Sequence, residues 1–192
     1  MSNRIPRTAL MLLAALLAAL TLAACGGEKD PTTNGDSEGS YIQAGPLVYQ
    51  VQVSRELNPF NVEDAQYLEG LPAGTPKPAA DQEWFAVWLR VQNPTDQVHP
   101  RAHDFRIVDT LGTVYEPIPL SPANPSAYEP GNVATSQGQP VYPNPESVAG
   151  GSPTNGAMLL FKLNTTAYAN RPLELQIVPP DGGKPSSVTL DL

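Results

Sequence analysis

The two histidines of this 192-residue chain, His99 and His103, have the spacing that most directly suggests metal chemistry. A His-x-x-x-His spacing on a helix places both imidazoles on one face, where they can bind one zinc ion. Pro100 follows His99 and a strand-like segment follows His103, so this stretch is not helical. Along an extended chain the two residues lie roughly 13 Å apart, too far for one ion. Asp104 and Asp109 do not complete a site by their spacing, so we expect no metal and no cofactor.

Hydrolytic chemistry would require a nucleophile beside a base, or two positioned carboxylates. The sequence has no Gly-x-Ser-x-Gly elbow, and its single cysteine, Cys25, precedes every strand-like segment. Glu63 and Asp64 are adjacent acids, but they lie in a loop-like region where a solvated charge pair is the simpler interpretation. We therefore predict that the chain is not an enzyme and keep a hydrolase as the least favoured alternative.

The residues before Cys25 give this cysteine a different role. Arg4 and Arg7 are followed by an Ala/Leu-rich block and then by Leu-Ala-Ala-Cys at 22–25. This is the order of a secretory signal peptide, and the apolar block is shorter than the roughly 20 residues that span a bilayer. Leu-Ala-Ala-Cys resembles the bacterial lipobox, which implies that residues 1–24 are removed and that Cys25 carries a lipid. The resemblance places the protein outside the cytoplasm, anchored to the outer face of the bacterial cell membrane.

Residues 25–42 are predicted to be a flexible tether. From residue 26 to 40 there is no aliphatic or aromatic side chain, and Gly, Ser, Thr and Asp are frequent, as in solvated spacers. A chain that begins at Tyr41 is therefore expected to be as stable as one that begins at Gly26. The folded domain is expected to cover residues 43–192.

Charge and composition restrict the partners and the fold class. The formal charge is −8 without a basic stripe, which argues against nucleic acid because that binding requires Lys and Arg at the phosphates. The chain contains 22 prolines, and turn residues separate its short β-branched and aromatic runs, which is typical of all-β proteins.

The strongest strand signal is Trp84–Asn93, with sequence WFAVWLRVQN. Its residues alternate between two faces, with Phe85, Val87, Leu89 and Val91 on one and Trp84, Ala86, Trp88 and Arg90 on the other. Because both faces are largely apolar, we place this strand at the centre of a sheet that is covered on both sides. Val87 and Leu89 are assigned to the core together with Phe161.

The face that carries Trp84, Trp88 and Arg90 is the candidate for partner binding. Two indoles at this spacing can stack on sugars or on apolar groups of a partner if they are exposed. If they are covered, they are core residues. We favour the covered arrangement, in which the long loop 116–155 packs over the rings through Tyr128, Val133, Val141 and Tyr142.

Further strand-like segments flank this central strand. They are Leu47–Leu57, a hairpin over 105–115, 157–163, 173–177 and 188–192, with a weak helical turn near Val62–Leu68 in the excursion 58–81. In the first of them, Leu47, Tyr49, Val51 and Val53 are predicted to share one face. Short alternating strands separated by turns predict an antiparallel β-sandwich.

Three segments in order carry a family resemblance: Val91-Gln92-Asn93, Phe105–Tyr115 and Gly156–Leu163. Together they resemble bacterial lipoprotein domains of unknown function with an immunoglobulin-like fold, which are similar to the secreted immunoprotective extracellular antigens. The resemblance covers residues 47–192 and implies a surface-anchored module without an established activity. Such domains commonly have a Pro-Gly pair before the third segment, where this chain has Gly-Gly-Ser-Pro at 150–153.

These observations leave two main functional interpretations. The first is a lipid-anchored module outside the cytoplasm that binds a protein partner or supports the envelope. The second is a cell-wall or carbohydrate-binding module. Both predict attachment to the membrane through a lipid on Cys25.

Overall fold

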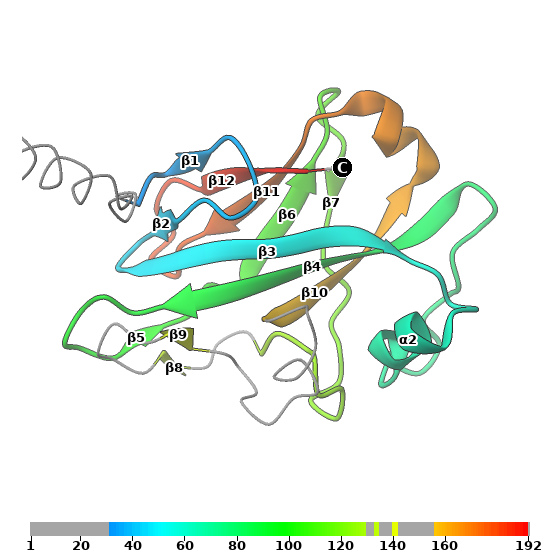
Figure 1. Cartoon of the computed structure of the whole chain (residues 1–192), viewed down its shortest axis with the longest axis horizontal. Helices are drawn as coiled ribbons and strands as arrows, with labels where there is room; N and C mark the ends of the chain where they lie inside the picture. The colour runs from blue at the N-terminus through cyan, green and yellow to red at the C-terminus, as the bar shows by residue number, and fades with distance from the viewer. Residues whose placement is uncertain (1–30, 130–132, 135–139, 142–155, 192) are drawn as a thin grey trace, which may run out of the picture. The chain divides into compact units, whose positions relative to one another are not determined.

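The computed structural model of the chain describes residues 31–129, 133–134, 140–141 and 156–191, and these are mostly strands and their connections (Figure 1). The predicted signal peptide, Cys25 and the Gly-Gly-Ser-Pro segment at 150–153 lie outside the described residues. No helix among those described is long and apolar enough to cross a membrane.

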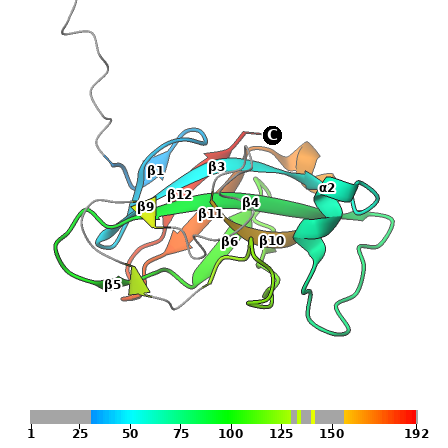
Figure 2. The same ribbon diagram turned by 60° about the horizontal axis from the view of Figure 1, so that its bottom comes forward.

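Two sheets stack face to face and enclose the main core (Figure 2). The first sheet has the order β10 (Ala157–Asn164), β4 (Gln82–Gln92), β3 (Leu47–Leu57) and β2 (Ile42–Ala44), with β9 (Pro140–Val141) on the end of β4. The second has the order β1 (Asn34–Gly35), β12 (Ser186–Leu190), β11 (Leu173–Val178), β6 (Asp104–Val108) and β7 (Val114–Tyr115). A small separate pair joins β5 (His99–Pro100) and β8 (Val133–Ala134).

Within the described part of the chain, helical structure is limited to short turns in the connections. These are α2 (Val62–Ala65), η2 (Gln66–Leu68) and η4 (Thr165–Asn170). The weak helical turn predicted near Val62–Leu68 is therefore confirmed. The all-β sandwich is confirmed as well, although one strand pair, β1 with β12, is parallel.

Strand β4 occupies the central position predicted for it, between β10 and β3. Val87, Leu89 and Phe161 are fully buried in the main core, as predicted from their strand phases. On this inner face the aromatic rings of Tyr49 and Tyr128 both pack edge-on against Phe105, with centroid distances of 6.4 and 5.1 Å. The second sheet therefore covers the inner face of β4, and the outer face needs another cover.

Strand β3 departs from the predicted alternation because it contains a β-bulge. Val51 lies opposite Leu89, but Val53 lies opposite Trp88, so Gln52 is an extra residue in the pairing. After a one-residue insertion every following side chain changes face. The prediction that Val53 shares the inner face with Leu47, Tyr49 and Val51 is therefore wrong, since it packs with the outer-face residues.

The prediction of a free tether over 25–42 is wrong for its described part. Residues 31–41, here called the N-terminal strap, lie along the sandwich, and β1 in this strap pairs with β12. Gly35 is buried so tightly that a Cβ there would lie 2.6 Å from the Ile42 side chain. Ile42 itself is fully buried in the main core. The folded unit begins at Pro31, because backbone hydrogen bonds can dock a segment that has few apolar side chains.

Glu38 fixes the strap to both sheets. Its carboxylate accepts hydrogen bonds from the Ser54 hydroxyl, from the Ser54 backbone N–H at 3.2 Å and from the Asp191 N–H at 3.3 Å. Burial raises the pKa of Glu38 above its ordinary value, and these hydrogen bonds to the charged form oppose that rise. A half-buried carboxylate with several donors indicates a docked segment rather than a solvated one.

Shortening the chain tests this assignment. A chain that begins at Tyr41 lacks β1 and the hydrogen bonds to Glu38, so we expect its unfolding free energy to fall by about 2–4 kcal/mol relative to a chain that begins at Gly26. This loss corresponds to a decrease in Tm of about 5–12 °C, measured by circular dichroism. Equal melting of the two chains would restore the interpretation of the strap as a free tether.

Candidate functional site

The outer face of β4 is buried under the excursion 58–81. Trp84 is 4% exposed and Trp88 is fully buried. They belong to a second apolar cluster, here called the outer cluster, formed by Leu57, Tyr67, Trp84, Ala86, Trp88, Met158 and Leu160. The expectation that the two indoles are covered is therefore confirmed.

The cover itself differs from the predicted one. Tyr67 of the excursion packs edge-on against Trp88 at a centroid distance of 5.1 Å, and Leu68 and Leu71 join it. The loop 116–155 contributes Ile118 and Leu120. Of the residues predicted to cover the indoles, Tyr128 packs in the main core instead, and Tyr142 and the side chains of Val133 and Val141 lie outside the described residues.

Trp84, Trp88 and Arg90 therefore do not form the exposed binding surface considered from the sequence. Both indoles are buried and Arg90 is half-buried. The cation that contacts Trp88 is Arg55, whose guanidinium lies 5.3 Å from the ring centroid. Arg55 reaches this face because the bulge in β3 turns it outward.

One ion pair fixes the start of the excursion to β3. Arg55 donates to the Asp64 carboxylate at 2.6 Å, and the backbone N–H of Asn58 donates to the other oxygen at 2.9 Å. Partial burial alone would raise the pKa of Asp64, but these two donors outweigh it and the pKa is lowered. Asp64 is buried while Glu63 is exposed, so the two acids are not the solvated pair that the sequence suggested.

Asn124 fixes the far side of the excursion. Its amide nitrogen donates to the carbonyl oxygens of Tyr67 at 2.9 Å and Glu69 at 2.8 Å. Its side-chain oxygen accepts from the Ser126 N–H at 2.9 Å, and the residue is only 2% exposed. The excursion and the segment 116–129 are thus joined over the outer cluster.

A cleft of about 590 Å³ lies where the excursion meets the ends of β3 and β4, and we call it the α2 cleft. Its lining combines apolar side chains with a few charged and polar ones. These residues are Glu56, Leu57, Pro59, Phe60, Ala65, Leu68, Leu71, Thr75, Lys77, Pro78, Gln82, Glu83 and Trp84. The volume lies in the range of small-ligand sites, and Trp84 is the one tryptophan in its lining.

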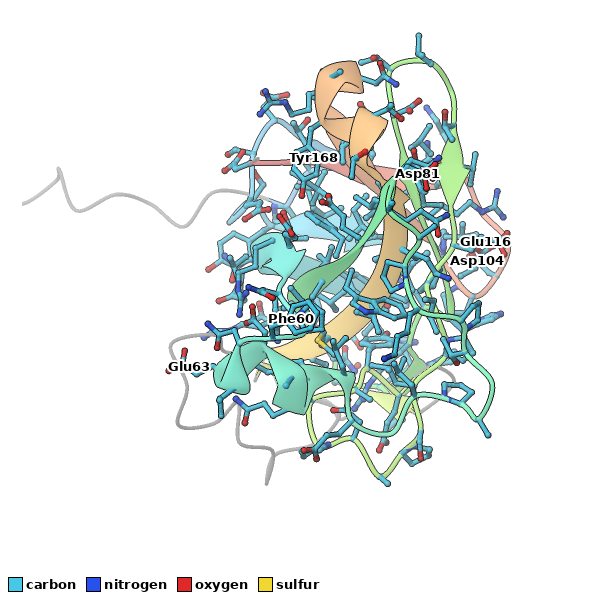
Figure 3. All side chains as sticks on the ribbon, turned by 90° about the vertical axis from the view of Figure 1, so that its right-hand side faces the viewer. Phe60, Glu63, Asp81, Asp104, Glu116 and Tyr168 are labelled. Carbon is cyan, nitrogen blue, oxygen red and sulfur yellow. The ribbon has the colours of Figure 1, made fainter. Side chains whose placement is uncertain are left out.

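Two large apolar side chains stand in solvent beside the α2 cleft. Phe60 is 95% exposed and Val62 is 88% exposed. Figure 3 shows Phe60 at the end of the sandwich that carries α2, with Glu63 nearby. Exposed apolar side chains next to an apolar cleft are a typical feature of a binding surface.

Carboxylates accompany these apolar groups. Burial raises the pKa of Glu83, and the neighbouring Glu56 raises it further, while a hydrogen bond with Tyr168 lowers it. Lys162 extends over the Trp84 ring, with its nitrogen 5.6 Å from the centroid, and donates to the Pro76 carbonyl at 3.0 Å. The cleft therefore has an apolar wall and a charged edge.

The histidines lie elsewhere and do not share a site in the described structure. The His99 ring is 2.9 Å from the Thr95 hydroxyl, and His103 is exposed at the edge of a second cavity of about 190 Å³. Among the described residues, no group of three or more His, Cys, Asp or Glu side chains is arranged to hold a metal ion.

Comparisons with known proteins give a match to a solved structure. No protein-family model and no curated protein matches the chain. A search of solved structures found an uncharacterized β-sandwich protein from Clostridium difficile 630, with 9% sequence identity and a TM-score of 0.39, over 86% of this chain and 99% of that one. The assignment of a β-sandwich here rests on the strand pairing described above.

Removing the Asn124 amide tests how the excursion is held. Asn124→Ala leaves the Tyr67 and Glu69 carbonyls without their donor, and we expect a loss of about 1–3 kcal/mol in unfolding free energy. Urea unfolding measures this loss, and acrylamide should quench tryptophan emission more strongly in the variant. Unchanged stability and unchanged quenching would show that Asn124 does not hold the cover in place.

The ion pair under α2 predicts a pH dependence. Asp64→Asn should cost about 1–2 kcal/mol at pH 7, because Arg55 is partly exposed and keeps some solvation. The lowered pKa of Asp64 means that its stabilisation is fully present above its ordinary value of 3.8 and disappears as the pH falls through the lower, folded-state value. Urea unfolding at pH 7 and pH 3 should therefore show the gap between variant and wild type closing. A gap of equal size at both values would contradict the ion-pair assignment.

Proposed function

We propose that this chain is a lipid-anchored β-sandwich that acts outside the cytoplasm, binds a partner at the α2 cleft and has no catalytic activity. One observation carries the proposal: Leu-Ala-Ala-Cys at 22–25 stands behind an arginine-flanked apolar block and directly before the folded unit. The resemblance to immunoglobulin-like lipoprotein domains belongs to the same proposal.

The length of the connection supports it. Pro31, the first residue of the folded unit, comes only six residues after Cys25, a length of at most about 20 Å when fully extended. A lipid on Cys25 would therefore keep the β1 end of the sandwich near the membrane surface. In Figures 1 and 2, β1 and α2 lie at opposite ends of the sandwich, so the α2 cleft is remote from the end at which the chain leads to Cys25.

A cell-wall or carbohydrate ligand has less support. Sugar recognition commonly uses the open face of an aromatic ring surrounded by hydrogen-bonding groups. Trp84 is 4% exposed and Trp88 is fully buried, so neither ring offers an open face. Sedimentation with purified peptidoglycan tests this alternative directly, and retention of the chain in the pellet would favour it over a protein partner.

Metabolic labelling tests the anchor. Cys25 is the only cysteine in the chain, so Cys25→Ser removes the only thiol that can accept a lipid. In bacteria grown with an alkyne fatty acid, we expect label on the wild-type chain and none on the variant.

A matched control keeps the test specific. Lys29→Gln changes a residue near the cysteine without removing the thiol, and this variant should label like the wild type. Label that persists on the Cys25→Ser chain would refute lipid anchoring.

A further inference from the structure

We infer that the α2 cleft binds a polypeptide segment of a partner protein in which a large apolar side chain is flanked by lysine or arginine. The inference rests on the proposed function in that the partner must be accessible outside the cytoplasm. Three features of the described surface carry it: the shape of the cleft, the apolar groups at its edge and the charge around it.

The cleft is large enough for apolar anchors. Its volume of about 590 Å³ exceeds that of a single side chain, and Leu57, Leu68 and Trp84 provide apolar walls. Phe60 and Val62 extend the apolar surface beyond the opening, because they are 95% and 88% exposed. A partner that fills the cleft and also covers these two side chains needs a larger contact surface than a small molecule offers. A peptide segment provides such a surface.

The negative charge around the cleft favours a partner segment that carries positive charge. Residues 55–84 contain six acidic residues, Arg55 and Lys77, and one further cation, Lys162, lies over the Trp84 ring. Of the six, Asp64 is paired with Arg55. Four others are exposed and form no ion pair among the described residues: Glu56, Glu63, Glu69 and Asp81. Figure 3 shows Glu63 and Asp81 on the side of the molecule that carries Phe60. An acidic surface next to an apolar cleft is complementary to a segment that combines apolar and cationic residues.

The same charge disfavours a second copy of this chain as the occupant. Two α2 ends brought together would place their carboxylates against each other, and like charges at an interface are costly. The net charge of −8 adds to this repulsion at long range. We therefore assign the cleft to a cationic partner segment and treat self-association as an outcome that would overturn the assignment.

The test uses a chain that begins at Gly26, which contains the whole folded unit but neither the apolar signal segment nor Cys25 and therefore needs no detergent. The probe is a fluorescein-labelled peptide of leucine, tryptophan and lysine, and binding is followed by fluorescence anisotropy. Two matched peptides replace every lysine by glutamate, or every leucine and tryptophan by serine. We expect the first peptide to bind, with an affinity that falls as the salt concentration is raised. We expect the other two peptides to bind at least about tenfold more weakly.

Variants locate the binding to the cleft. Phe60→Ser removes an exposed ring, so it should leave stability unchanged and weaken binding about tenfold. Ala65→Phe places a ring at the cleft wall and should block binding without changing the charge. The matched control is Leu111→Ser at the tip of the β6–β7 hairpin, where the leucine is 76% exposed, and this variant should bind like the wild type.

Each contrary result has a defined meaning. Equal binding of the glutamate peptide would overturn the cationic assignment, and equal binding by Phe60→Ser would show that the peptide binds elsewhere. Dimerisation in analytical ultracentrifugation that Phe60→Ser abolishes would assign the cleft to a second copy. The lipid-labelling experiment is independent of all three, so a failure of the anchor and a failure of the cleft are distinguishable.

Discussion

The burial of β4 on both faces is the constraint on which the rest of the structure depends. Its inner residues, such as Leu89, are covered by the second sheet, as in any sandwich. Its outer residues include Trp88, which no sheet covers. Leaving a large apolar side chain in water forgoes about 1.5–3 kcal/mol of burial free energy. The excursion 58–81 is therefore part of the fold, because it supplies the apolar layer that the outer face requires.

The bulge at Gln52 makes this outer layer possible. If β3 alternated regularly through Gln52 without a bulge, its second half would direct Arg55 and Leu57 into the main core, where a charged side chain would lack water. With it, Leu57 joins the outer cluster and Arg55 reaches both the Trp88 ring and Asp64. A single insertion in one strand thus supplies an apolar contact, a cation over an aromatic ring and the ion pair that fixes the excursion.

The sequence predicted the elements whose evidence is local. Alternation located β4, and the same signal identified the core position of Phe161. It did not reveal the docked strap, because the strap is held by the backbone pairing at Gly35 and by the hydrogen bonds to the half-buried Glu38 carboxylate rather than by apolar burial. It also did not identify the cover over Trp88, since the choice between the excursion 58–81 and the loop 116–155 requires knowledge of the tertiary contacts. The prediction from alternation in β3 is wrong after Gln52, because a pattern with a period of two contains no sign of a β-bulge.

The α2 cleft follows from how the excursion is anchored. Asp64 holds its first turn and Asn124 holds its middle, while Phe60 lies in the short loop between Asn58 and Asp64 with its ring in solvent. Trp84 is shared, because it packs in the outer cluster and also lines the cleft. A partner that fills the cleft would therefore contact the outer cluster, which covers β4. Its binding energy would add to the stability of the excursion, since a ligand that binds only the folded state stabilises that state.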